Sequence, residues 1–153
     1  MGNIFNDDFR DFIQSMNKHE VEYMLVGGYA VILHGYRRVT GDMDIWVNRT
    51  PENYVRITSA FADFGLPLFD MTNERFMNAE TADVFSYGRA PVRIDIITEL
   101  KGVKFDEAFS QAQMFNEDGL MIRFIHLNNL IQAKQAAGRH KDLDDLEKLT
   151  DGR

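Results

Sequence analysis

Cysteine and long hydrophobic runs are both absent from this chain. With no cysteine among its 153 residues, disulfides and thiolate metal sites are excluded, and nothing points to an oxidising compartment. No apolar run approaches the roughly 18 residues that a membrane-spanning helix needs. The amino terminus is polar and acidic, unlike a secretory signal. We therefore expect a soluble cytoplasmic protein that does not enter a membrane.

Positive charge is also scarce. The chain carries 24 acidic and 17 basic residues, a formal net charge of −7 at pH 7, and no run of four or more Lys or Arg residues. The negative electrostatic field of such a chain repels polyanions, so a dedicated nucleic-acid binder is disfavoured. A phosphate-bearing substrate is instead expected to arrive together with its metal ion.

The patterning predicts one mixed α/β (α+β) domain spanning residues 1–153, with a mixed sheet flanked by helices. Apolar spacing predicts an amphipathic helix over residues 7–18, and a Thr-Pro-Glu start predicts another over 51–64. Further helices are expected over 29–34 and 105–114, and two more over 127–149, divided near Gly138. Strands are expected over 21–26, 42–47, 83–87, 92–98 and 120–125, with a hairpin turn at 88–91. Residues 66–83 show no sustained period.

Two of these strands carry carboxylates. Asp42 and Asp44 are two residues apart, which places them on the same face of a strand with Cα atoms roughly 6.5 Å apart. Asp95 is embedded in the apolar run from 92 to 97. If the strands are neighbours, three carboxylates need a cation, and Mg²⁺ or Mn²⁺ with oxygen ligands fits. Alternatively, each Asp lies at a strand end and is solvated or paired with Arg38 or Arg93.

Two other features bear on phosphate binding. Gly27 and Gly28 lie between a predicted strand and a predicted helix, where backbone N–H groups can approach phosphate, although such a pair is more often a simple turn. Lys134 lies in the apolar stripe of its helix, so it either meets an anionic partner or extends along the stripe to solvent. Trp46 shares the acidic face, where base stacking and ordinary packing are both open.

The order of these motifs resembles the nucleotidyltransferase superfamily, the DNA polymerase β-like fold. The resemblance rests on Val26-Gly27-Gly28, then thirteen residues, then Asp42-Met43-Asp44-Ile45. More narrowly, the Arg38-to-Asp44 stretch is similar to short bacterial proteins related to the AbiEii/AbiGii toxin nucleotidyltransferases. Their later pattern is matched by residues 134–145, namely Lys134, Gly138, Arg139, Lys141, Asp142 and Asp145.

This resemblance implies a Mg²⁺-dependent (or Mn²⁺-dependent) enzyme that moves an NMP group from an NTP such as ATP to an acceptor hydroxyl, releasing pyrophosphate. It implies that Asp42, Asp44 and Asp95 are the catalytic and metal-binding residues. It also implies that Gly27 and Gly28 line the triphosphate, with Lys134 and Arg38 as further nucleotide contacts. Many relatives have Ser where Gly28 stands, which leaves that contact to backbone N–H groups.

Arg38 is equally well explained by an ordinary salt bridge, and Arg139, Lys141, Asp142 and Asp145 mainly by a structural charge network. The acceptor is either a small molecule or supplied by a partner protein, and homo-oligomerisation is compatible with the sequence. The alternative function is a regulatory or binding component of a toxin–antitoxin or phage-defence pair, with little or no turnover.

Overall fold

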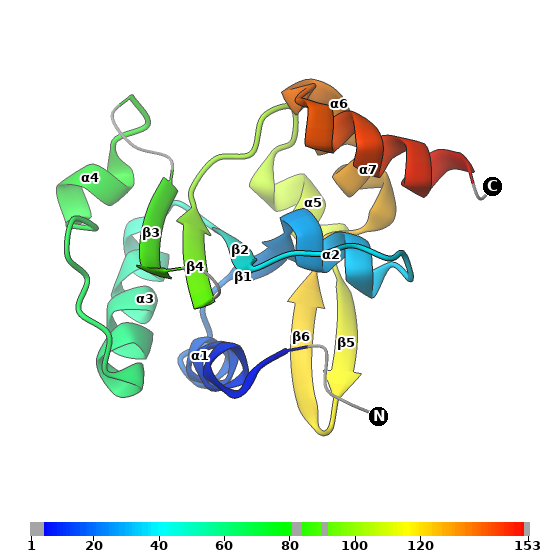
Figure 1. Cartoon of the computed structure of the whole chain (residues 1–153). Helices are drawn as coiled ribbons and strands as arrows, with labels where there is room; N and C mark the ends of the chain where they lie inside the picture. Colours follow the sequence, from blue (N-terminus) through cyan, green and yellow to red (C-terminus); the bar gives the residue numbers. More distant parts are fainter. Residues whose placement is uncertain (1–4, 81–83, 90–91, 152–153) are drawn as a thin grey trace.

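A single mixed sheet runs through the part of the chain that the computed structural model describes, residues 5–80, 84–89 and 92–151. Within these residues the sheet has six strands in the order β3-β4-β2-β1-β6-β5 (Figure 1). At its centre β2 pairs parallel with β4 and antiparallel with β1, and β1 pairs parallel with β6. The strands are β1 Tyr23–Val26, β2 Asp42–Val47, β3 Val84–Arg89, β4 Val92–Ile97, β5 Gln113–Glu117 and β6 Leu120–Phe124.

Helices cover both faces of this sheet (Figure 1). One face packs against α1 (Asp7–Lys18) and α3 (Pro51–Phe64), with the short α4 (Asn73–Met77) beside α3. The other face is covered by α2 (Gly27–Leu33), α5 (Phe105–Gln111), α6 (Leu127–Ala137) and α7 (His140–Asp151). The predicted mixed α/β (α+β) architecture with C-terminal helices is therefore confirmed.

Side-chain alternation along β2 divides the core in two. Met43, Ile45 and Val47 are fully buried against α1 and α3, whose apolar stripe includes Phe9 and Phe12 as predicted. On the opposite face, the cluster that contains Trp46 packs against the other helices. That opposite face also carries Asp42 and Asp44, because they alternate with the buried apolar residues of β2.

Local signals set the ends of the longer helices. Thr50 caps α3 by accepting a hydrogen bond from the backbone N–H of Asn53, and Gly65 ends the helix with a φ of 88°. Gly138, with a φ of 66°, separates α6 from α7. These boundaries are the ones predicted from sequence. Among the described residues, no helix has the length and apolar character needed to cross a bilayer.

The prediction of a helix over 105–114 is wrong at its end. The α5 helix stops at Gln111, and β5 begins at Gln113 and pairs antiparallel with β6. Asp118 and Gly119 join these strands with φ values of 50° and 89°, the left-handed conformations that suit a two-residue hairpin. The strand before this turn was not predicted, because pairing with β6 decides its conformation.

The β3–β4 hairpin is confirmed in its strands, which pair antiparallel from Val84↔Ile97 onward. Asp83 and the Ala90-Pro91 part of the predicted turn lie outside the described residues. The stretch without a period, 66–83, contains the short helix α4, which Thr72 caps by accepting a hydrogen bond from the N–H of Arg75.

Asn53 joins the first helix after β2 to the ends of two strands, and we expect it to matter for stability. Its fully buried amide accepts from the N–H of Glu22 at 2.8 Å and donates to the carbonyls of Glu22 and Asn48 at 3.1 and 2.9 Å. Asn53→Ala removes all three bonds and leaves the N–H of Glu22 unpaired, whereas the two carbonyls still accept from the N–H groups of Asn48 and Thr50. The free energy of unfolding in urea should therefore fall by about 2–4 kcal/mol. The exposed neighbour Glu52 is the control. Equal losses in Asn53→Ala and Glu52→Ala would contradict this role.

Candidate functional site

The three aspartates predicted as a site come together on one face of the sheet. In the parallel pairing of β2 with β4, Asp44 lies opposite Asp95, and Asp42 lies opposite Arg93. The carboxyl groups of Asp44 and Asp95 share a hydrogen bond, and the charge of Asp42 also acts on Asp44. Asp95 is only 6% exposed. The neighbouring placement of the two acidic strands, which sequence could only assume, is thus present in the fold.

Burial and the neighbouring acids change the titration of Asp44. Its pKa is raised from 3.8 to about 7, first by burial, then by the charge of Asp95 and the hydrogen bond with it, and then by Asp42. Lys141 acts in the opposite direction. At neutral pH, Asp44 is therefore protonated in a large fraction of molecules, which allows its carboxyl to donate to Asp95.

Arg93 balances the other two carboxylates. One nitrogen of its guanidinium, Nη2, lies 3.1 Å from Oδ2 of Asp42 and 3.0 Å from Oδ2 of Asp95. The hydrogen bond with Asp95, followed by the charges of Asp95 and Asp42, raises the pKa of Arg93. The pairing with Arg93, considered from sequence as the alternative to a metal, thus occurs for Asp42 and Asp95. In the described part of the chain, no three His, Asp or Glu side chains are arranged as a metal-binding group.

Arg93 does not satisfy the whole cluster. Oδ1 of Asp95 is buried and has no hydrogen-bond partner among the described residues, and the same holds for Nε of Arg93. A buried carboxylate oxygen without a partner is costly, and a cation or a donor from a ligand would remove that cost. Oδ1 of Asp95 is therefore left as an acceptor for a cation or a ligand that is not part of the chain.

The two glycines lie against this cluster as the first residues of α2, rather than in a separate turn before it. A Cβ atom on Gly27 would collide with Oδ2 of Asp44, and the φ of Gly27 is +67°. A Cβ atom on Gly28 would lie 2.8 Å from Cβ and Oγ1 of Thr40. Thr40 thus occupies the space of a side chain at position 28, and its hydroxyl donates to the carbonyl of Asp42 at 3.2 Å.

Lys134 and Arg38 are already paired with acidic residues of α7. The ammonium of Lys134, only 6% exposed, lies 3.3 Å from Asp142 and 3.0 Å from Asp145. Arg38 donates through Nε to Asp145 at 2.9 Å. Arg139 completes the network with a 2.7 Å bond to Asp142. The structural charge network is therefore present, whereas contacts of Lys134 and Arg38 with a nucleotide stay predictions.

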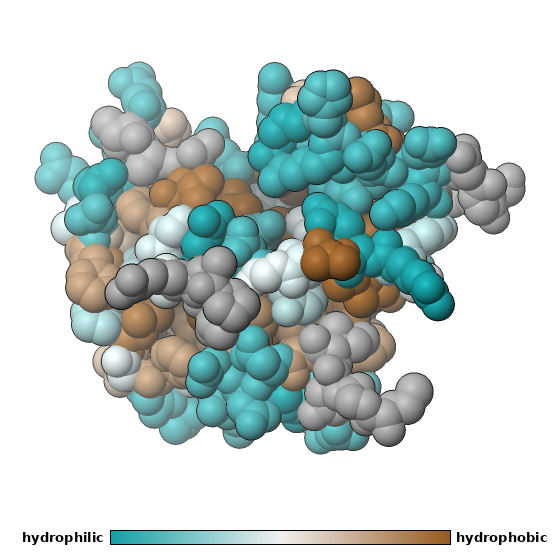
Figure 2. Space-filling model, viewed as in Figure 1, coloured by the Kyte–Doolittle hydropathy of each residue, from teal (hydrophilic) through white to brown (hydrophobic). Residues whose placement is uncertain are grey.

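Lys141 is a cation that sequence reasoning gave little weight. It is exposed near the start of α7 and forms no ion pair within the described part of the chain, yet its charge lowers the pKa of Asp44. Hydrophilic residues cover this α6–α7 corner in the space-filling view (Figure 2). The signal in sequence was its position in the basic and acidic stretch after Gly138.

Trp46 packs in the core. It is 1% exposed, and its ring meets Phe105 edge to face, with centroids 5.1 Å apart. Of the two roles open from sequence, packing is the one that the structure shows. Base stacking would need an exposed ring face.

Comparisons with known proteins establish the fold. No family model matches the chain, and no curated protein matches its sequence. A protein proposed to be a nucleotidyltransferase from Thermotoga maritima aligns with a TM-score of 0.57 and 14% identity, over 95% of this chain and 91% of its own. An antigenic nucleotidyltransferase-like protein from Paracoccidioides brasiliensis aligns with a TM-score of 0.51 and 13% identity, over 97% of this chain and 78% of its own. The chain thus shares its fold with nucleotidyltransferase-like structures.

Asp44 should make the stability of the metal-free protein depend on pH. Its folded pKa of about 7 exceeds the ordinary 3.8, so the native state binds its proton more tightly and stability falls as pH rises between these values. Asp44→Asn removes this fall, so its stability relative to the wild type should rise from pH 4 to 8, by up to about 1.4 kcal/mol per unit of pKa shift. Urea unfolding with a chelator measures this. Parallel pH profiles for the two proteins would contradict it.

The network under α7 offers a matched pair of variants. Asp145 is 1% exposed and pairs with Lys134 and Arg38, whereas its neighbour Asp144 is exposed. Asp145→Ala leaves a buried lysine without one of its partners and should reduce the free energy of unfolding by about 3–5 kcal/mol. Asp144→Ala should change it by less than about 0.5 kcal/mol. Free energies of unfolding are measured in urea. Similar losses in both variants would show that the buried ion pairs of Asp145 add no stability beyond that of an exposed carboxylate.

Proposed function

We propose that this protein is a metal-dependent nucleotidyltransferase, which moves an NMP group from an NTP to an acceptor hydroxyl and releases pyrophosphate. The observation that carries the proposal is the meeting of Asp42, Asp44 and Asp95 on adjacent strands, beside two glycines at the start of α2. The fold shared with nucleotidyltransferase-like structures agrees with it. A cluster of this kind has no evident structural purpose, because three acids in contact destabilise the metal-free protein.

The donor set fits Mg²⁺ or Mn²⁺. Both cations prefer oxygen ligands, and the carboxylates of Asp42, Asp44 and Asp95 would hold them, with the unpartnered Oδ1 of Asp95 as a free ligand atom. A bound cation would neutralise charge on the phosphate oxygens and lower the pKa of the attacking hydroxyl. Positive charge brought to the cluster would also allow Asp44 to lose its proton.

The chain's own residues then have distinct tasks. Asp95 is suited to accept the proton of the acceptor hydroxyl. Gly27, which has no side chain, leaves the approach to Asp44 open for a ligand. Arg93, whose side chain is 42% exposed, would leave Asp42 and Asp95 when a metal arrives and would be free to pair with phosphate, as would the exposed Lys141.

Lys134 and Arg38 can contribute in two ways. The sequence prediction places them on the nucleotide, and their ion pairs with Asp145 also hold α7 close to the cluster. The second role requires no broken ion pair, and it keeps α7, which carries Lys141, in place. Both roles belong to the same proposed activity.

The finer assignment is a short bacterial nucleotidyltransferase of the AbiEii/AbiGii-related kind, with an acceptor that is a small molecule or lies on a partner protein. Its motivation is the motif from Arg38 to Asp44 together with the later Lys134-to-Asp145 pattern. The net charge of −7 disfavours a nucleic-acid acceptor.

Arg93 favours a second candidate function, a binding or regulatory component of a toxin–antitoxin or phage-defence pair with little turnover. Because Arg93 already neutralises Asp42 and Asp95, the cluster is balanced in part without a metal. Co-purification with the product of a neighbouring gene would support this candidate. Modification of a small acceptor by the isolated protein would count against it.

The proposed activity predicts metal-dependent nucleotide binding that needs the three acids. Calorimetry with Mg·ATP and the other three Mg·NTPs should show binding by the wild type. Asp42→Asn and Asp95→Asn should each weaken it by about tenfold or more, because each removes a charged ligand that is worth at least 1.4 kcal/mol. Pyrophosphate release from labelled NTPs with Mn²⁺ should fall in parallel.

The exposed Asp144→Asn is the matched control and should bind as the wild type does. Arg93→Gln tests whether the guanidinium competes with the metal for Asp42 and Asp95, because its removal should then strengthen Mn²⁺ binding in the absence of nucleotide. If Mg·NTP binding were the same in Asp42→Asn, Asp95→Asn and the wild type, the site assignment would be wrong. If NTPs bind but no pyrophosphate is released with any acceptor tried, the binding function is favoured.

A further inference from the structure

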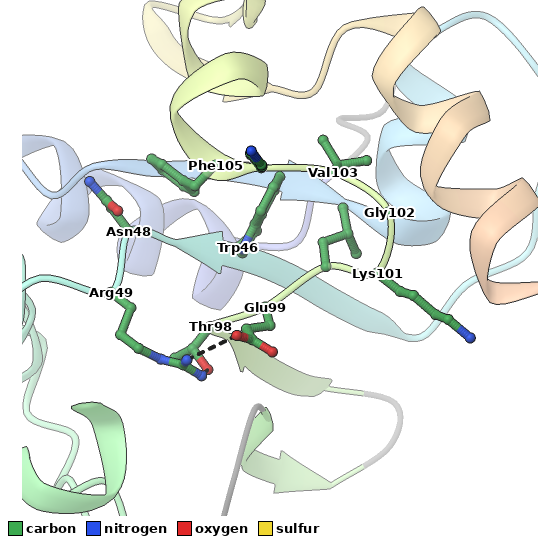
Figure 3. Close-up of a pocket in the computed structure, with 11 residues that line it drawn as sticks. Trp46, Asn48, Arg49, Thr98, Glu99, Lys101, Gly102, Val103 and Phe105 are labelled. Carbon is green, nitrogen blue, oxygen red and sulfur yellow. Dashed lines mark hydrogen bonds and ion pairs between the residues drawn. The ribbon is translucent and has the colours of Figure 1, made fainter. Parts of the chain in front are cut away.

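A second site lies farther along the strands that carry the aspartates. A cavity of about 640 Å³ opens between the ends of β2 and β4 and the loop that precedes α5 (Figure 3). Its lining includes Trp46, Arg49 and Glu99, and none of the three aspartates. Trp46 lies opposite Ile97, one same-face step beyond the pair of Asp44 and Asp95. The cavity is therefore a neighbour of the acidic cluster and separate from it.

Arg49 is the partly buried cation of this cavity. Its side chain is 13% exposed, and it donates to the hydroxyl of Thr98 at 2.6 Å and to Glu99 at 3.1 Å, the bond drawn in Figure 3. The Glu99 side chain is 56% exposed, so water weakens this ion pair. Nε of Arg49 is buried and has no partner among the described residues. The guanidinium thus has one donor unused and only a weak counter-charge.

Trp46 supplies a second unused donor. Its indole Nε1 is buried and, in the described part of the chain, has no hydrogen-bond partner. Trp46 and Arg49 both line the cavity. Two buried N–H donors beside one cavity call for an acceptor, because each unpaired donor carries a desolvation cost. Neither belongs to the machinery of the acidic cluster.

The charge of the lining agrees with this chemistry. Arg49, Lys101 and Lys104 outnumber the single acid Glu99, although the whole chain carries a net charge of −7. Lys101 extends away from the other side chains in Figure 3. It therefore adds positive electrostatic potential at the opening of the cavity and does not contact a ligand inside it. Apolar surface is also present, from Leu100, Val103 and Phe105.

We propose that this cavity binds a small organic oxyanion, a molecule whose carboxylate or phosphate group accepts from Arg49 and Trp46 while its apolar part contacts Leu100, Val103 and Phe105. The anion replaces the exposed carboxylate of Glu99 as the main partner of Arg49. The proposal is independent of nucleotidyl transfer, because no residue of the acidic cluster takes part in it.

The single tryptophan of the chain makes this site directly observable. In a ¹⁵N–¹H spectrum, one indole cross-peak reports the hydrogen bond of Trp46, and titration with benzoate and with inorganic phosphate should shift it saturably for at least one of the two. A response to benzoate alone identifies a carboxylate with a planar apolar part, and a response to phosphate alone identifies a phosphate. No saturable shift with either probe overturns the proposal.

Two variants with opposite expected effects test the role of Arg49. Arg49→Gln should weaken anion binding by about tenfold or more, because it removes a charged donor. Glu99→Gln, at a position whose side chain is 56% exposed, should strengthen binding by about two- to fivefold, because the competing carboxylate is gone. The exposed Arg56→Gln on α3 is the charge-matched control and should bind as the wild type does. Unchanged or weaker binding in Glu99→Gln overturns the proposal, even if Arg49→Gln fails to fold.

Discussion

Three carboxylates on adjacent strands cannot all stay charged in a partly buried site without a compensating positive charge, and this constraint governs the candidate site. The structure meets it in two ways. Arg93 bridges Asp42 and Asp95, and the pKa of Asp44 rises to about 7, so that this acid can keep its proton. Both are means of reducing negative charge where no metal is bound. A divalent cation would reduce the same charge more strongly, which is why the cluster and the proposed metal chemistry agree.

Neighbouring segments fix the surroundings of the acidic cluster. Gly27 lets Asp44 lie against the backbone of α2, and Thr40 occupies the space beside Gly28. The buried network of Lys134 with Asp142 and Asp145 fixes α7 on α6, and Arg38 ties the segment before β2 to the same helix. Several buried ion pairs therefore fix α6, α7 and the segment before β2 relative to one another.

Much of the fold could be predicted because its signals are local. The helices α1 and α3 have strong apolar stripes and clear caps, and Gly138 marks the division between α6 and α7. The strand β5 could not be recognised, because its residues read equally well as the end of α5 until they pair with β6. The short helix α4 was not recognised because its five residues are too few to show a helical period, and its placement depends on packing beside α3.

By itself, the sequence indicated the residues of the candidate site: the spacing of Asp42 and Asp44, the embedded Asp95, the Gly-Gly pair and the inward Lys134. Tertiary structure alone decided what each of them meets. Strand order and register bring Asp95 opposite Asp44, and the turn of α6 into α7 gives Lys134 its two acidic partners. Periodicity reports the face on which a side chain lies, but it does not report which distant segment covers that face. The pairings of Arg93 and the unused donors of Trp46 and Arg49 depend on such long-range contacts, and so they became visible only in the folded chain.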